Sequence, residues 1–121
     1  MIKSIGSQSL PTADSSGCFI SDLLWSDPTT NEDGNIENQF MKNKNRGCSF
    51  VFGRQAAVNL MEDNNLISII RGHEVQFEGF KFYDWLDQGF PQVINVFSAA
   101  NYCEKYNNKG AIITLDVGSL E

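Results

Sequence analysis

The stretch LISIIRGHE, residues 66–74, decides the fold of this 121-residue chain, because an apolar run ends there in charged residues. Apart from Ser68, its first five residues are leucine or isoleucine. Such a run is too apolar for an exposed loop and too short for a helix, so it predicts a buried strand. Gly72 lets the backbone bend, and His73, the only histidine, follows at the strand's carboxyl end, where α/β sheets present functional side chains. A lone histidine is more often an ordinary hydrogen-bonded residue than a metal ligand, so both interpretations stay open here.

The residues around this strand predict one helix and several short strands. Small and apolar residues recur with the spacing of one helix face over residues 53–65, and Asn64 or Asn65 can end that helix in a left-handed conformation. Residues 19–25 form a short apolar stretch, which the Ser-Asp-Pro turn at residues 26–28 ends. Strands are predicted at residues 48–52, 80–83 with an extension through 85–86, 93–97 and 111–115.

Two polar segments lie in the first third of the chain. Residues 1–17 are rich in serine, with glycine, proline and threonine, and predict a flexible N-terminal segment. Residues 29–45 hold many Asn, Asp, Glu and Lys residues and predict a solvated loop. Three apolar side chains of that loop, Ile36, Phe40 and Met41, are expected to pin one of its faces.

Composition limits the class of protein. The chain is 41% hydrophobic and 20% charged, which suits one soluble globular unit with a moderate core. A net charge of -6 without a basic cluster argues against nucleic-acid binding. No apolar run approaches the roughly 20 residues of a membrane span, and the first residues lack the apolar core of a signal peptide. Three cysteines without a C-x-x-C pair indicate neither a disulfide framework nor structural zinc, and predict a reducing cytoplasmic or nuclear location.

Four motifs occur in a fixed order: LLWSDP at residues 23–28, RGCSFVFG at 46–53, IIRGHE at 69–74 and FSAANYCEKYNNKGA at 97–111. In this order they resemble the C-terminal half of the catalytic domain of metal-dependent serine/threonine protein phosphatases, the phosphoprotein phosphatase family. The resemblance is closest to the calcineurin catalytic subunit branch. That branch shares the long connection before RGCS, the GFP triplet at residues 89–91 and YNNK at residues 106–109.

The resemblance implies a fold and a reaction. The fold is α/β (α+β), with residues 18–121 forming the C-terminal part of a metallophosphoesterase-like two-sheet β-sandwich flanked by helices. The reaction is hydrolysis of phosphoserine or phosphothreonine by water that two metal ions activate. The metal ions implied are manganese, or iron and zinc.

The resemblance also assigns roles to single residues. His73 corresponds to one metal ligand, and Arg46 and Tyr102 correspond to catalytic, phosphate-binding residues. A guanidinium suits this role because its planar donors match two phosphate oxygens. Without the family context Arg46 is a surface or salt-bridged residue and Tyr102 a half-buried loop tyrosine. Three further residues, Trp25, Asp27 and Arg71, are expected to support the site without touching the substrate.

Two departures from the family pattern affect these expectations. Ala100 stands where the family has proline, which loosens the loop around Tyr102. The family's upstream metal-binding segments, GD-x-HG, GD-x-VDRG and GNHE, are absent from the sequence. The chain is therefore expected to be a phosphatase fragment, inactive alone, with exposed apolar faces. Its expected partners are phosphoprotein substrates and the regulatory subunits of a phosphatase holoenzyme.

Two alternatives remain open from the sequence. The chain is either a non-catalytic fragment that acts through protein–protein interaction, or part of another metallophosphoesterase such as a nucleotide hydrolase. The combination of LLWSDP, RG-x-S and SA-x-NYC favours a protein phosphatase over the nucleotide hydrolase.

Overall fold

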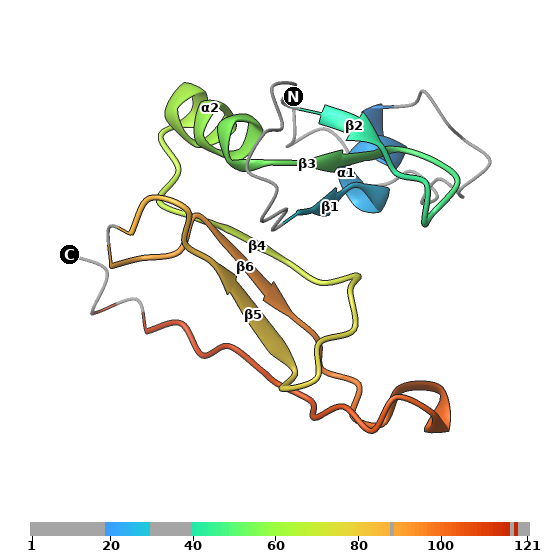
Figure 1. Cartoon of the computed structure of the whole chain (residues 1–121). Coiled ribbons are helices and arrows are strands. Elements are labelled where there is room, and N and C mark those ends of the chain that lie inside the picture. Colours follow the sequence, from blue (N-terminus) through green and yellow to red (C-terminus); the bar gives the residue numbers. More distant parts are fainter. Residues whose placement is uncertain (1–18, 30–39, 88, 117, 119–121) are drawn as a thin grey trace. The chain divides into compact units, whose positions relative to one another are not determined.

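The computed structural model describes residues 19–29, 40–87, 89–116 and 118, which fall into two compact units, Met1–Gly53 and Arg54–Glu121. The predicted flexible segment at residues 1–17 lies outside the described residues, as does Ile36. Within the described residues, each unit contains one α-helix and one three-stranded sheet (Figure 1). The predicted α+β class is confirmed.

The sheet of the first unit is built around β3 (Phe50–Phe52). This strand pairs in parallel with β1 (Asp27–Pro28) and antiparallel with β2 (Phe40–Lys42), which gives the strand order β1-β3-β2. Helix α1 (Phe19–Trp25) precedes β1 in the chain. Each strand has only two or three residues, so backbone pairing with the middle strand defines them more than their own residue pattern does.

Two predictions for the first unit are wrong in part. Phe40 and Met41 belong to β2 rather than to a solvated loop, and they are 52% and 38% exposed instead of pinning a face. The polar composition of this segment predicted a loop, but β2 forms because β3 supplies it with backbone hydrogen-bond partners. The predicted strand at residues 48–52 begins only at Phe50, because Ser49 has φ +54, which is outside the extended region.

Helix α2 (Arg54–Asn64) opens the second unit and confirms the predicted helix. Its buried residues are Ala56 and Ala57, on the predicted face. Asn65 adopts φ +52 and ends the helix in the left-handed conformation, as its residue type allows. No helix among the described residues is long and apolar enough to cross a membrane.

The sheet of the second unit has β6 (Val93–Val96) at its centre. It pairs in parallel with β4 (Ile69–Arg71) and antiparallel with β5 (Phe80–Tyr83), in the order β4-β6-β5. Val93 is 0% exposed and Ile94 is 8% exposed, so the predicted buried strand is confirmed at this position. The short helix η2 (Tyr102–Glu104) follows in the last loop.

The apolar run that predicted the central buried strand is divided between two elements. Leu66 donates its N–H to the carbonyl of Met61 at 2.9 Å, so it completes the end of α2 and does not enter the sheet. The strand begins at Ile69 and lies at the sheet edge. As a result Ile67 is 73% exposed and Ile70 is 48% exposed, and the predicted burial is wrong for them.

Two further strand predictions are wrong. The extension of β5 fails because Trp85 and Leu86 both donate their N–H groups to Gln92 Oε1, at 2.7 and 3.2 Å, which turns the chain. No strand is assigned over residues 111–115. Ala111 donates to the carbonyl of Phe97 at 3.0 Å, but the residues after it do not extend this contact into a ladder.

Gly79 lets three segments of the second unit meet closely. Its φ is +85, and its carbonyl accepts a hydrogen bond from Phe97 N at 2.7 Å. A Cβ atom on Gly79 would lie 2.8 Å from the backbone nitrogen of Ala111. Glycine is therefore required here by both its backbone angle and the space around it.

We expect Gly79→Ala to lower the free energy of unfolding more than Gly89→Ala does, in urea denaturation of the 121-residue chain. Both substitutions put a side chain at a left-handed φ, which costs about 1 to 2 kcal/mol. Only the Gly79 variant adds overlap with backbone atoms, because nothing lies within 4 Å of a Cβ on Gly89. Equal losses in the two variants would contradict the close approach to Ala111.

Candidate functional site

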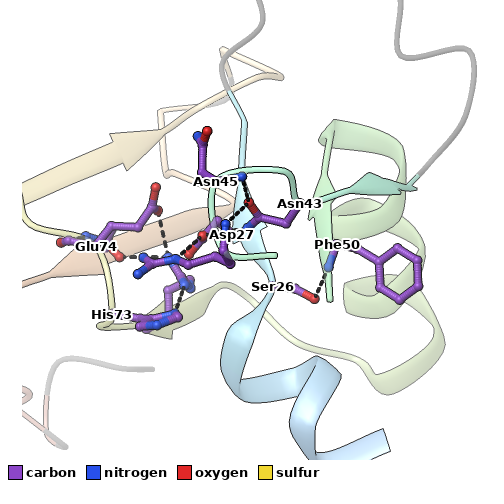
Figure 2. A network of polar contacts seen from close by, with 10 residues as sticks. Ser26, Asp27, Asn43, Asn45, Phe50, His73 and Glu74 are labelled. Carbon is purple, nitrogen blue, oxygen red and sulfur yellow. Dashed lines mark hydrogen bonds and ion pairs between the residues drawn. The ribbon is translucent and has the colours of Figure 1, made fainter. Parts of the chain in front are cut away.

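Asp27 is the acceptor at the centre of a polar cluster in the first unit (Figure 2). Its Oδ2 accepts hydrogen bonds from Asn43 Nδ2 at 2.8 Å and from Arg46 Nε at 2.9 Å. Asp27 and Asn43 are buried, while the Arg46 side chain is 29% exposed. The carboxylate is thus largely removed from water, and the guanidinium balances its charge. The turn predicted at Asp27 is wrong, because this residue begins strand β1, and its carboxylate fixes the direction of the Arg46 side chain.

Asn43 shapes the loop that carries Arg46. Its Oδ1 accepts hydrogen bonds from the N–H groups of Asn45 at 3.2 Å and Arg46 at 3.1 Å. Its carbonyl accepts from Gly47 N at 3.0 Å, and its own N–H donates to Ser49 O at 3.0 Å. An asparagine side chain that binds the N–H groups two and three residues ahead closes a tight turn. Backbone and side chain of Arg46 are therefore both held by contacts to this cluster.

In the second unit, a second polar cluster joins the ends of two neighbouring strands. Arg71 ends β4 and lies beside Asn95 of β6 in the parallel register. Arg71 Nη1 donates to Asn95 Oδ1 at 3.0 Å and to Glu74 Oε2 at 2.8 Å. Asn95 Nδ2 donates to the carbonyl of Glu74 at 2.9 Å. The three residues form a closed set of contacts around the turn that carries His73.

His73 lies in that turn with an unusual backbone conformation. Its φ is +83, a value that few residues other than glycine adopt. Its side chain is half-buried, and Arg71 Nη2 lies 3.5 Å from His73 Nδ1, which is long for a hydrogen bond. Glu74 follows directly, and both side chains can be seen in Figure 2. The turn after β4 thus presents the chain's only histidine next to an arginine and a glutamate.

Tyr102 lies in a separate loop of the second unit, which Asn108 organises. Asn108 is 4% exposed, and its Oδ1 accepts a hydrogen bond from Tyr102 N at 2.9 Å. Its Nδ2 donates to the carbonyls of Ala99 at 2.8 Å and Lys109 at 2.9 Å. Tyr102 is 44% exposed, and its ring packs edge-on against Phe97, with ring centroids 5.1 Å apart. The loop therefore has an internal anchor even with Ala100 in place of proline.

The residues singled out from the sequence fall into three local groups. Asp27 and Arg46 are brought together in the first unit, and Arg71 and His73 in the second. Trp25 ends α1, two residues before Asp27. Tyr102 is held by the contacts of its own loop.

Three buried asparagines were not singled out as site residues from the sequence. Asn43, Asn95 and Asn108 each fix one of the three groups through their side-chain amides. A signal existed for Asn95, which is the one polar residue in an apolar strand. For Asn43 and Asn108 the sequence contained no such signal, because both lie in Asn-rich turns, where asparagine is common.

The described residues do not by themselves suit a metal site. Within the described ranges, no three His, Cys, Asp or Glu side chains gather closely enough to hold one ion. Protein metal sites usually have three or more protein ligands. A metal ion bound to His73 with three protein ligands would therefore take at least one of them from residues outside these ranges.

The sequence is similar to known phosphatase subunits. It is 42% identical over 101 residues to the serine/threonine-protein phosphatase 2B catalytic subunit A1 of Saccharomyces cerevisiae, covering 76% of this chain and 18% of that protein. It is 34% identical over 118 aligned residues to subunit A2 of the same organism, covering 76% of this chain and 20% of that protein. The chain thus spans about a fifth of the length of these curated relatives.

The fold has a counterpart among solved structures. A protein serine/threonine phosphatase from Saccharomyces cerevisiae, described as similar to human phosphatase PP5, matches with a TM-score of 0.58 and 31% sequence identity. The match covers 83% of this chain and 27% of that one. No protein-family model matches the sequence. Sequence and fold therefore agree: the chain is similar to a C-terminal region of phosphoprotein phosphatases, and in sequence it is similar to the calcineurin catalytic subunits.

Proposed function

We propose that this chain supplies part of the active site of a serine/threonine protein phosphatase. The observation that carries the proposal is the Asp27–Arg46 pair, in which a buried carboxylate holds a guanidinium at a fixed point of the RG-x-S motif. A guanidinium with a fixed direction binds a phosphoryl group at a lower entropic cost than a mobile one. The similarity to the phosphatase 2B catalytic subunits supports the same role.

Each candidate residue has a role in this proposal. Arg46 binds two oxygens of the phosphoryl group, and Tyr102 donates a hydrogen bond to it from the loop that Asn108 holds. Asp27 positions Arg46. His73 is one ligand of a metal pair, and Arg71 supports its turn. Trp25 supports the cluster around Asp27.

The metal pair in this proposal is manganese, or iron and zinc. At least part of its further ligand set comes from residues other than those described, because His73 has no two companion ligands within the described ranges. The ions would supply the nucleophilic water and charge neutralisation. The residues of this chain bind and orient the phosphoryl group.

The proposal includes partners and a location. Phosphoprotein substrates follow from the proposed reaction, and regulatory subunits of a holoenzyme follow from the similarity to a phosphatase subunit. A cytoplasmic or nuclear location is supported by the thiols of Cys48 and Cys103, the two described cysteines, which are both free.

A second candidate function, protein–protein interaction without catalysis, is favoured by one observation. The register of β5 and β6 places Phe80, Phe82 and Ile94 on one face of the sheet, and Phe80 and Phe82 are 45% and 57% exposed. A face with two exposed aromatic side chains is a common protein-binding feature. A folded chain that binds a phosphatase subunit or substrate yet never contributes to turnover would support this function.

A segment exchange tests the catalytic proposal. The matching stretch of the yeast phosphatase 2B catalytic subunit A1 is replaced by residues 19–116 of this chain, and phosphate release from a phosphoserine peptide is measured with added manganese. We expect turnover, and a loss of about 100-fold or more in kcat/KM in the Arg46→Ala variant, because a charge-assisted contact to the phosphoryl group is removed.

The controls separate the role of the guanidinium from general damage. Arg54→Ala removes an exposed arginine of α2 and should leave kcat/KM unchanged. Arg46→Lys keeps the charge but not the planar pair of donors, so its kcat/KM should lie between the values of wild type and Arg46→Ala. A folded exchange protein without turnover, or one whose Arg46→Ala variant keeps full turnover, would contradict the proposal.

We expect Asp27→Ala in the exchange protein to lower the free energy of unfolding by about 2 to 3 kcal/mol, because it leaves a partly buried cation and the Asn43 amide without their acceptor. It should also lower kcat/KM, but much less when Arg46 is already alanine, since Asp27 acts through Arg46. Asp63→Ala removes an exposed carboxylate, so it should change the free energy of unfolding by no more than about 0.5 kcal/mol and leave kcat/KM unchanged. Fully additive losses in the Asp27→Ala/Arg46→Ala pair would refute the positioning role.

A further inference from the structure

Asn95 is a fully buried polar residue in the middle of an apolar strand. It is 0% exposed and lies in β6 between Ile94 and Val96. Asparagine is disfavoured in strands, and a buried amide without hydrogen-bond partners is costly. A buried asparagine at the centre of a sheet therefore calls for an explanation from its contacts.

The contacts of Asn95 point to the turn that carries His73. Its Oδ1 accepts from Arg71 Nη1 at 3.0 Å, and its Nδ2 donates to the carbonyl of Glu74 at 2.9 Å. Arg71 is two residues before His73 and Glu74 is one residue after it. One side chain on a neighbouring strand thus contacts the residues at both ends of the four-residue turn, through the guanidinium of Arg71 and the backbone carbonyl of Glu74.

Two observations show that this turn is constrained. Arg71 Nη1 also donates to Glu74 Oε2 at 2.8 Å, which closes the same turn from within. His73 keeps φ +83, a conformation that a residue with a side chain holds only where its surroundings impose it. The contacts of Asn95 are part of such surroundings, because they hold the Arg71 guanidinium before His73 and the Glu74 carbonyl after it.

We propose that Asn95 is a positioning residue for His73, acting through Arg71 and the Glu74 carbonyl. The link to metal binding rests on the proposed function of His73, but the effect on the turn does not. Asn108 offers a matched control in the same unit. It is also a buried asparagine with both ends of its amide bonded, and it serves the Tyr102 loop instead.

Because His73 is the only histidine, its imidazole resonances report on the turn directly in NMR spectra of the 121-residue chain. Three variants are compared with wild type. Asn95→Leu keeps the branched side-chain skeleton and removes both hydrogen bonds, and Asn95→Asp keeps the acceptor for Arg71 but loses the donor to Glu74. Asn108→Leu is the control. The methyl resonances of Val93 and Ile94 report whether the sheet remains folded.

We expect the His73 signals of Asn95→Leu to move to the positions of histidine in an unfolded peptide while the Val93 and Ile94 methyl signals stay in place. Asn95→Asp should show a smaller shift in the same direction. Asn108→Leu should shift the ring signals of Tyr102 and leave those of His73 unchanged. If Asn95→Leu unfolds the sheet, the proposal is tested by the Asn95→Asp variant alone. A shifted His73 signal in that variant supports the proposal, and an unshifted signal overturns it.

Either of two other results would overturn the proposal. One is unshifted His73 signals in a folded Asn95→Leu chain. The other is wild-type His73 signals already at unfolded-peptide positions, which would mean that the turn is not held.

The same substitution in the exchange protein separates this proposal from the proposed function. Asn95→Leu should raise the half-saturating manganese concentration about 10-fold or more, as loss of a residue that orients a metal ligand does, with kcat largely restored at high manganese. An unchanged manganese dependence in an active protein would overturn the link from Asn95 to metal binding. An exchange protein that is inactive with Asn95 intact would count against the proposed function and leave the NMR result on the turn standing.

Discussion

A buried amide must have hydrogen-bond partners, and three loops of this chain depend on that constraint. Asn43, Asn95 and Asn108 are each less than 5% exposed, and each uses its side chain to hold a different loop. Asparagine suits this task because one side chain offers two donors and an acceptor with two lone pairs. Each of the three can therefore bind a backbone group and another partner at once, which a leucine with the same branched shape cannot do.

The charged residues take their positions from these amides. Arg46 is held by Asp27 and by the turn that Asn43 closes, while Arg71 is held by Asn95 and Glu74. In both places an arginine, whose planar group carries five donors, is combined with a carboxylate and an asparagine. The buried charge is balanced and the direction of the guanidinium is set, which are the two conditions for a cation that binds a phosphoryl group or supports a neighbouring ligand.

Much of the fold could be predicted from the sequence, for reasons that differ between elements. The helix at residues 54–64 was found from the spacing of its small and apolar residues, and the strand at residues 93–96 from an apolar run that is buried in the sheet. Burial was predicted wrongly for Leu66, Ile67 and Ile70, because the side chains of an apolar run are buried only where another part of the chain covers them. The strand at residues 40–42 was missed because its cause is pairing with a distant segment, which local composition does not encode.

The site was predicted less completely than the fold. Motif resemblance located Arg46, His73 and Tyr102, but it gave no reason for their geometry. That reason lies with Asn43 and Asn108 in polar turns, where an asparagine has no distinguishing pattern, and with Asn95, whose partners are known only once two strands are paired. Hydrogen bonds between residues far apart in sequence become visible only in three dimensions.

The strand order β4-β6-β5 has a consequence for synthesis of the chain. The ribosome makes β4 and β5 before β6, although β6 is the strand with which both of them pair. Until β6 emerges, Ile69–Arg71 and Phe80–Tyr83 lack the partner that their backbone groups will have in the finished sheet. The nascent chain therefore passes through an interval in which two unpaired strands with apolar side chains are exposed, the condition under which chaperones are needed.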